Sequence, residues 1–362
     1  MGAGPPSVVY APLHPMARTE NKDVMGAGGG LAAAIATESG PDLGELAPVE
    51  ARGYWEQVWR HFKRDKLAIV SGVFIIFLVI VAAVGGPIAQ RLLGHGPSDL
   101  FFDGVNKDLL PVGPLTRLHD ASGKSTIFIL GADGTLGRDE FLRLLYGARV
   151  SLEVAVLSTL TTTVIGVLLG SIAGYYRGWV DTIISRVIEI TMAFPVLIFI
   201  IALAATIGDR LNNVTFGFFD RGVLTLLFVF TIFGWFYQAR IVRSQVLSLR
   251  EKEFVEAARM VGASDWRIVS THILPHLVAP IIVVSTLSVA GFVLAEAGLS
   301  FLGLGVKLPT PSWGNLLSEA PNFYTTQPWL LVWPGLAVLL TTLAFNLLGD
   351  GLRDAFDPRS AH

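Results

Sequence analysis

Residues 67–90 read LAIVSGVFIIFLVIVAAVGGPIAQ, and none of them is Asp, Glu, Lys or Arg. An α-helix rises about 1.5 Å per residue, so a run of this length can cross a bilayer hydrocarbon core that is about 30 Å thick. The stretch therefore predicts a membrane-spanning helix.

Further stretches without these charged residues recur along the chain. They are 154–176, 190–208, 222–239, 268–295 and 320–349. The last two are longer than one span needs, and we expect their helices near 277–297 and 329–349. The helix over 190–208 should begin near Ile183 and so include Glu189. The pattern predicts an all-α, polytopic membrane protein with six transmembrane helices.

The composition agrees with this fold class and excludes others. Of the 362 residues, 52% are hydrophobic and 15% are charged, whereas soluble domains have about 25% charged residues. A net charge of −2 argues against a nucleic-acid-binding protein, which would carry a basic surface. The chain has no cysteine, which excludes disulfides, iron–sulfur clusters and thiolate metal sites.

Lys and Arg residues indicate the orientation in the membrane. They are frequent at 60–66, just before the first span, and at 240–276, but rare at 209–221 and 298–328. Because short cytoplasmic loops carry an excess of these residues, both termini and 240–276 are predicted to be cytoplasmic. Segments 91–147 and 298–328 are then predicted to lie outside the cell membrane.

The chain before the first span divides into two parts. Residues 1–50 have no periodic apolar face and are predicted to be a disordered extension. Residues 51–66 place Trp55, Val58, Trp59 and Phe62 on one helical face, which favours an amphipathic helix in the membrane interface. The alternative is a soluble helix that packs on a partner protein.

The charged stretch EFVEAARMVGASDWR, residues 253–267, predicts two short helices joined by a turn. Gly262 allows the left-handed turn that ends a helix. Ser264 can cap the second helix and Asp265 suits its first turn, while Pro275 should end that helix before the next span. The residues alone indicate an exposed docking module.

Two carboxylates, Glu189 and Glu296, fall in or beside apolar spans. A carboxylate in a span is costly, so each is a candidate functional site. The alternative is a structural ion pair, for example between Glu189 and Arg186. No nucleophile–base pair or metal cluster is visible in the spans, so we expect neither a catalytic nor a metal site.

Several motifs together resemble a known family. The residues of the EAA loop of bacterial ABC-importer permeases occur here in the right spacing, as Glu256, Ala257, Ala258, Gly262, Leu274 and Pro275. Further stretches resemble motifs of the C-type permease subunits of dipeptide and oligopeptide importers, the DppC/OppC class. They occur in the same order as in that class, at 137–139, 144–152, 298–305, 309–314, 346–354 and 357–359. His272 and Glu189 depart from the pattern, which has Ile and Asp there.

The resemblance implies the type I ABC importer fold with a cytoplasmic coupling helix. It implies that the chain forms half of a translocation path for peptides or a related small substrate, with no catalytic residue of its own. The loop that docks on the ATPase would use Glu256, Ala257, Ala258, Gly262, Ala263, Ser264, Asp265 and Trp266. The alternative function is that of an ATP-independent secondary transporter.

The resemblance also implies an organisation and a set of partners. Residues 67–90 would be the first transmembrane helix and 91–147 an extracytoplasmic segment. A permease core of five helices would cover 148–352, with the coupling loop at 251–275, and 353–362 would be a cytoplasmic tail. The expected partners are a homologous second permease, two ABC ATPases, an extracytoplasmic substrate-binding protein and membrane lipid, but no nucleic acid. ATP and Mg would bind to the ATPases, leaving this chain without a cofactor.

Overall fold

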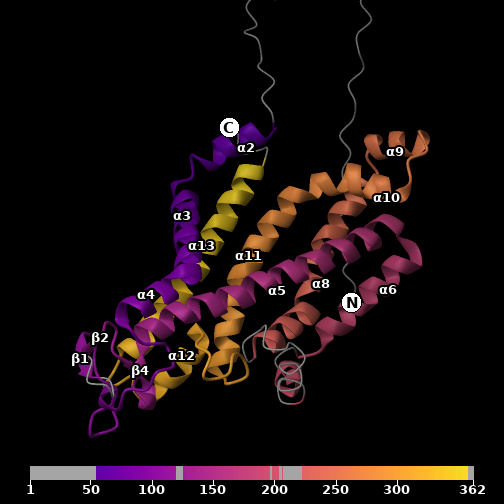
Figure 1. The fold of residues 1–362 in the computed structure, drawn as a ribbon. Coiled ribbons are helices and arrows are strands. Elements are labelled where there is room, and N and C mark those ends of the chain that lie inside the picture. Colours follow the sequence, from indigo (N-terminus) through magenta and orange to yellow (C-terminus); the bar gives the residue numbers. More distant parts are fainter. Residues whose placement is uncertain (1–53, 120–124, 196–197, 204–205, 207–221, 358–362) are drawn as a thin grey trace, which may run out of the picture. The chain divides into compact units, whose positions relative to one another are not determined.

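The computed structural model describes residues 54–119, 125–195, 198–203, 206 and 222–357. The expected disordered extension at 1–50 and residues 358–362, half of the tail expected at 353–362, lie outside the described residues. In the described part the chain is predominantly helical (Figure 1). Helices long and apolar enough to cross a membrane cover Lys66–Leu93, Glu140–Tyr176, Val223–Leu249, Asp265–Phe301 and Trp329–Phe356.

These helices correspond to the first, second, fourth, fifth and sixth expected spans. The third expected span differs, because α6 (Gly178–Ala193) ends before Phe194 and Pro195. A residue that precedes proline is disfavoured in helical conformation, so the unbroken helix expected from Ile183 is wrong. Part of the expected span lies outside the described residues, and the number of six spans stays a prediction.

The first span is preceded by α2 (Tyr54–Phe62) and consists of α3 (Lys66–Ile80), a π-helical turn (Val81–Gly85) and α4 (Gly86–Leu93). Asp65 caps α3, because its Oδ1 accepts hydrogen bonds from the backbone N–H groups of Leu67 and Ala68, at 2.9 and 3.1 Å. The charged segment thus ends where the apolar helix begins.

The longest helix, α5 (Glu140–Tyr176, 37 residues), packs closely along α8 (Val223–Leu249). Gly166, Gly170 and Gly174 lie four residues apart on the contacting face of α5. A Cβ on Gly170 would lie 2.5 Å from the carbonyl oxygen of Ala239, which is too close for any side chain. Small residues at this spacing let two membrane helices approach to backbone contact.

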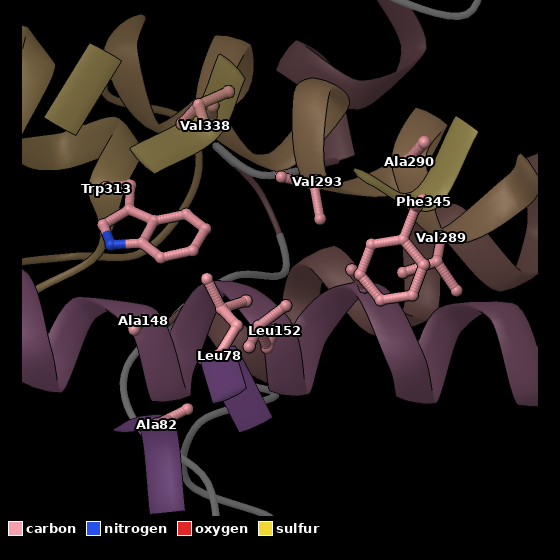
Figure 2. Packing of buried hydrophobic residues seen from close by; sticks show 12 residues of the cluster. Leu78, Ala82, Ala148, Leu152, Val289, Ala290, Val293, Trp313, Val338 and Phe345 are labelled. Carbon is pink, nitrogen blue, oxygen red and sulfur yellow. The ribbon is translucent and has the colours of Figure 1, made fainter. Parts of the chain in front are cut away.

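The main apolar core lies where α3 and α5 meet α11 (Leu274–Phe301), α12 (Trp313–Glu319) and α13 (Trp329–Phe356). Trp313 is its largest side chain and is 2% exposed. The Trp313 indole Nε1–H donates to the carbonyl oxygen of Leu144 at 3.2 Å. Figure 2 shows Trp313 on the opposite side of this core from Phe345, with Val293 and Leu152 between them. The core fixes α12 against the first half of α5.

A small β cap, which we define as residues 95–119 and 125–139, joins α4 to α5. Strands β1 (Thr116–His119) and β2 (Ser125–Phe128) pair antiparallel, as do β3 (Ala132–Asp133) and β4 (Arg138–Asp139). Short 3-10 turns lie at Phe102–Gly104, Gly134–Leu136 and, beyond the cap, Ala320–Asn322. The expectation of a purely α fold missed these strands, which are too short to show an alternating pattern. Helix α5 also begins at Glu140, inside the segment that we expected outside the membrane.

Buried charges tie the β cap to the helices. Arg138 Nη2 lies 2.8 Å from Asp133 Oδ2 and 3.1 Å from Glu319 Oε1, and Arg143 Nε lies 2.5 Å from Asp133 Oδ2. Burial and the nearby charge of Asp133 raise the pKa of Glu319, although Arg138 opposes them. A break in such a buried pair leaves an uncompensated charge, so the network holds β4, α5 and α12 in one arrangement.

Candidate functional site

Helix α9 (Glu253–Met260) ends in the turn expected at Gly262. Gly262 has φ +84°, and its N–H donates to the carbonyl oxygen of Arg259 at 2.9 Å. The N–H of Ala263 donates to the carbonyl oxygen of Ala258 at 3.0 Å. These two bonds form a Schellman motif, which satisfies the last carbonyl groups of the helix and requires a left-handed residue at Gly262. The predicted turn is confirmed.

The second helix, α10 (Asp265–Arg267), begins differently from the prediction. Ser264 occupies the N-cap position, but its side chain makes no capping hydrogen bond. The Asp265 carboxylate instead accepts a hydrogen bond from the hydroxyl of Tyr175, with 2.7 Å between the oxygens. A distant tyrosine at the end of α5 therefore holds the start of α10, a role that sequence reasoning assigned to a local cap.

Pro275 does not end this helix, contrary to our expectation. A π-helical segment (Ile268–Ile273) follows α10 and leads without a break into α11, where Pro275 is in the first turn. Proline is tolerated there because the π-helical segment interrupts the regular α-helical hydrogen-bond ladder just before it, so the missing N–H is accommodated. The loop is thus continuous with the fifth expected span, with no break between α10 and α11.

The inner face of the loop packs on the helices. Val255, Ile268 and Ile273 have no exposed surface. They form a cluster with Tyr175, Val242, Val246 and Leu277 from α5, α8 and α11. Ala258 and Ala263 pack against the same cluster. Of the two adjacent alanines expected to receive a partner, Ala258 therefore contacts the chain's own core, and Ala257 is exposed.

The outer face of the loop has no cover in the described chain. We call it the loop face and define it as Glu256, Ala257, Met260, Val261 and Trp266. The side chains of Met260, Val261 and Trp266 are 84%, 89% and 72% exposed. Sequence reasoning missed Met260 and Val261, although two apolar residues that directly precede a turn glycine are a readable signal of an exposed apolar tip. An exposed apolar patch with a polar rim is typical of a protein interface.

Arginines surround Tyr175 below the loop. The guanidinium groups of Arg259 and Arg250 lie 5.4 and 5.8 Å from the centre of its ring. Arg250 also donates to the carbonyl oxygen of Tyr175. Burial and the positive charges of Arg177 and Arg259 lower the pKa of Arg250. This end of the bundle therefore concentrates positive charge around one aromatic residue.

The two candidate carboxylates in the spans lie apart from the loop and from each other. Glu189 on α6 pairs with Arg186, its Oε2 2.7 Å from Arg186 Nη1, which matches the structural alternative. Glu296 on α11 is fully buried and accepts a hydrogen bond from the Ser300 hydroxyl at 2.7 Å. Within the described residues, no three His, Cys, Asp or Glu side chains form a group that could hold a metal ion.

Comparison with known proteins gives two family matches and close relatives. Residues 166–362 match the family described as "Binding-protein-dependent transport system inner membrane component". Residues 53–111 match the "N-terminal TM domain of oligopeptide transport permease C". The glutathione transport system permease protein GsiD of Pectobacterium atrosepticum is 38% identical over 84% of this chain and 91% of its own length. The dipeptide transport system permease protein DppC of Alkalihalophilus pseudofirmus is 39% identical over 84% and 90%.

The similarity to a solved structure is weaker than the similarity to these relatives. The inward-facing MetNI methionine ABC transporter aligns with a TM-score of 0.48 at 18% identity, over 59% of this chain and 96% of the solved chain. The assignment rests instead on the family matches and the relatives, which extend over most of the chain. The chain belongs to the family of binding-protein-dependent transport system inner membrane components and is a non-catalytic, multi-pass permease subunit of an ABC importer.

Proposed function

We propose that the loop face is the surface through which this permease binds a separate ABC ATPase and follows its ATP-driven closure. The ATPase, with its ATP and Mg, would bind on the side that carries residues 251–275, which we predict to be cytoplasmic. A second, homologous permease would complete the translocation path, and an extracytoplasmic binding protein would deliver the substrate.

The observation that carries this proposal is the division of the loop into two faces. Val255 and Ile268 anchor the inner face in the helices, whereas Val261 and Trp266 present apolar surface outward. A solvated loop with no partner would not keep a Trp and a Val this exposed at the tip of a fixed turn. Anchoring is equally necessary, because a docking surface transmits force only if it is attached to the helices that move.

The proposed substrate is a short peptide or a related small molecule. Support comes from the functions of the relatives, which are glutathione and dipeptide transport. Glutathione is itself a tripeptide, so the shared chemistry is a small molecule with peptide bonds and free carboxylates. Uptake by the complete importer in proteoliposomes, with dipeptides, glutathione and nickel as competing candidates, tests this choice.

The docking surface is tested by charge substitutions on the loop face. We expect Val261→Asp, Trp266→Asp and Glu256→Lys to reduce both ATPase co-purification and substrate-stimulated ATP hydrolysis. The reduction should be about tenfold or more for Trp266, since interface tryptophans are common hot spots. Gly262→Val should act by a different route, straining the left-handed turn while open space remains around the new side chain.

The matched control is Leu109→Asp in the β cap, which is 69% exposed but lies on a different part of the chain. It should leave ATPase binding unchanged. If the ATPase co-purifies and responds to substrate at the wild-type level in all loop-face variants, the proposed docking surface is wrong. Uptake that persists without ATP would favour the secondary transporter instead.

A further inference from the structure

Helix α6 exposes an ion pair among apolar side chains. The Arg186 and Glu189 side chains are 73% and 60% exposed, and their charged atoms lie 2.7 Å apart. Ile183 and Ile190 on the same helix are exposed as well. Charged side chains in a membrane-embedded helix are costly against lipid tails and almost always face protein or water. This face of α6 is therefore not suited to contact with lipid chains.

The position of α6 is fixed by α8, a candidate membrane span. Arg243 Nη2 donates to Asp181 Oδ2 at 2.7 Å, and Arg240 Nη1 contacts the Met192 sulfur at 3.5 Å. The two helices thus lie side by side over most of the length of α6, as Figure 1 also shows. The second half of α8 thus contacts α6 through Asp181 and Met192, and Glu189 lies three residues from Met192 on α6.

That half of α8 is polar on its outward side. Tyr237, Arg240, Ser244 and Ser248 are exposed, and they follow one another at intervals of three or four residues. This spacing places them on one helical face. We define the α6/α8 polar face as Arg186, Glu189, Tyr237, Arg240 and Ser244.

One cation on this face has no anionic partner among the described residues. Arg243 is paired with Asp181 and Arg186 with Glu189, but among the described residues no carboxylate oxygen lies within ion-pair distance of Arg240. Arg240 lies nine residues before the end of α8 at Leu249, which places it roughly 13 Å inside that end. We had expected Arg240 in a loop beyond the fourth span, and the structure places it within the helix.

We propose that the α6/α8 polar face lines the aqueous path that this permease shares with the second permease, and that Arg240 binds a carboxylate of the passing substrate. The proposal rests on the proposed function, since it assigns the path for a peptide-like substrate. Arginine suits this task because its planar guanidinium can hold a carboxylate with two hydrogen bonds and keeps its charge at every relevant pH. The ion pair of Arg186 and Glu189 would keep the adjacent wall of the path hydrated, and its two opposite charges would add no net charge.

Water access is the first test, and it uses the absence of cysteine from the chain. Single cysteines replace Glu189, Arg240 or Ser244 in the complete importer in lipid vesicles, and a charged, impermeant thiol reagent is applied from both sides. The control is Ile76→Cys on α3, which is 62% exposed and lies in the apolar first span. Only a hydrated thiol ionises and reacts, so we expect labelling at least about tenfold faster at the polar face. Equal rates at Ile76 and the polar face would overturn the proposal.

Substrate recognition is the second test. Uptake is measured for Arg240→Gln and Arg240→Lys with a peptide that has a free carboxyl terminus and with its amide, both delivered by the same binding protein. Because the binding protein is unchanged, the ratio of variant uptake to wild-type uptake reports on the permease alone. We expect Arg240→Gln to lower uptake of the free acid by about tenfold, the equivalent of one charged hydrogen bond, and to leave the amide unaffected. Arg240→Lys should restore part of the difference.

Two other outcomes of the uptake test would contradict the role proposed for Arg240. Equal loss for the acid and the amide would overturn the role of Arg240 in substrate binding. An effect that appears only in vesicles with anionic lipid would show that Arg240 binds a lipid headgroup, which also contradicts the proposal. The labelling test is independent of the docking test, because water access to the α6/α8 polar face does not depend on where the ATPase docks. The labelling pattern is therefore expected even if the loop-face variants bind the ATPase normally.

Discussion

The hydroxyl of Tyr175, the second-to-last residue of α5, donates a hydrogen bond to the carboxylate of Asp265, the first residue of α10, at 2.7 Å. The two residues are 90 positions apart in the chain. Their bond joins the end of α5 to the loop, while the apolar cluster around Val255 and Ile268 holds the same loop from below. A hydrogen bond and apolar packing therefore fix the loop independently, so a single substitution can remove one of them and leave the other in place.

Tyr175→Phe should loosen the start of α10 without unfolding the chain. The substitution keeps the buried ring and removes one hydrogen bond to a charged group, which is worth about 1.5–3 kcal/mol. We expect faster hydrogen exchange at 253–267 and weaker substrate stimulation of the ATPase. Tyr176→Phe is the matched control, since it removes the same hydroxyl from the neighbouring tyrosine, which is half exposed. Similar exchange in both variants would contradict the anchoring role.

Gly170→Ala should destabilise the pairing of α5 with α8. The added methyl group would meet the Ala239 carbonyl oxygen at 2.5 Å and the Val242 Cβ at 2.9 Å, so the two helices must move apart. Overpacking of this kind costs about 1–3 kcal/mol, measurable as a lower thermal midpoint of the purified complex. Gly291→Ala on α11 is the control, because nothing lies within 4 Å of its added Cβ. It should be neutral or slightly stabilising, and a loss as large as that of Gly170→Ala would refute the close-approach explanation.

Glu319→Gln should change how the stability of the β cap depends on pH. Burial raises the pKa of Glu319, so its carboxyl holds a proton more tightly in the folded chain than in the unfolded chain. The stabilisation from the Glu319 carboxyl is therefore fully present below the ordinary pKa of a glutamate, about 4.3. It is lost as the pH rises through the raised pKa of Glu319 in the folded chain. We expect the thermal midpoint of wild type, relative to Glu319→Gln, to fall over this interval. A difference that is constant, or that grows with pH, would contradict the sign.

The orientation is tested with two single cysteines, at Lys107 in the β cap and at Ser264 in the loop, both exposed positions. An impermeant maleimide applied to intact cells should label the first and not the second, because short loops rich in Lys and Arg stay in the cytoplasm. Permeabilised cells provide the control, where both sites should react. The reverse pattern in intact cells would show that the termini and the loop lie outside.

Local signals in the sequence predicted the spans and the turn at Gly262. Each depends on residues that are neighbours in the chain, namely an apolar run or a glycine at a helix end. The break in the third span also had a local signal, Pro195, whose effect on Phe194 we did not weigh. The repeat of Gly166, Gly170 and Gly174 was readable in the same way and was missed.

Contacts between distant residues explain the remaining differences. The start of α10 is held by the hydrogen bond from the Tyr175 hydroxyl to the Asp265 side chain rather than by a Ser264 cap, and no pattern in the sequence relates Tyr175 to Asp265. Arg138 in β4 donates a hydrogen bond to Glu319, which lies 181 positions away, and no local pattern predicts that contact. The polar face around Arg240 required knowing that α8 continues to Leu249, because the first arginine after an apolar run resembles the end of a span.

Helix α5 is about 55 Å long at 1.5 Å per residue, which exceeds the hydrocarbon core by roughly 25 Å. Near one end Arg143 is bonded to Asp133 of the β cap, and near the other Tyr175 is bonded to Asp265. A rigid rod attached at both ends acts as a lever, and the free energy that couples two sites through it is the same in both directions. We therefore expect an antibody fragment that clamps the β cap to change the affinity of the complete importer for ATP, and ATP to change the affinity for the fragment by the same factor.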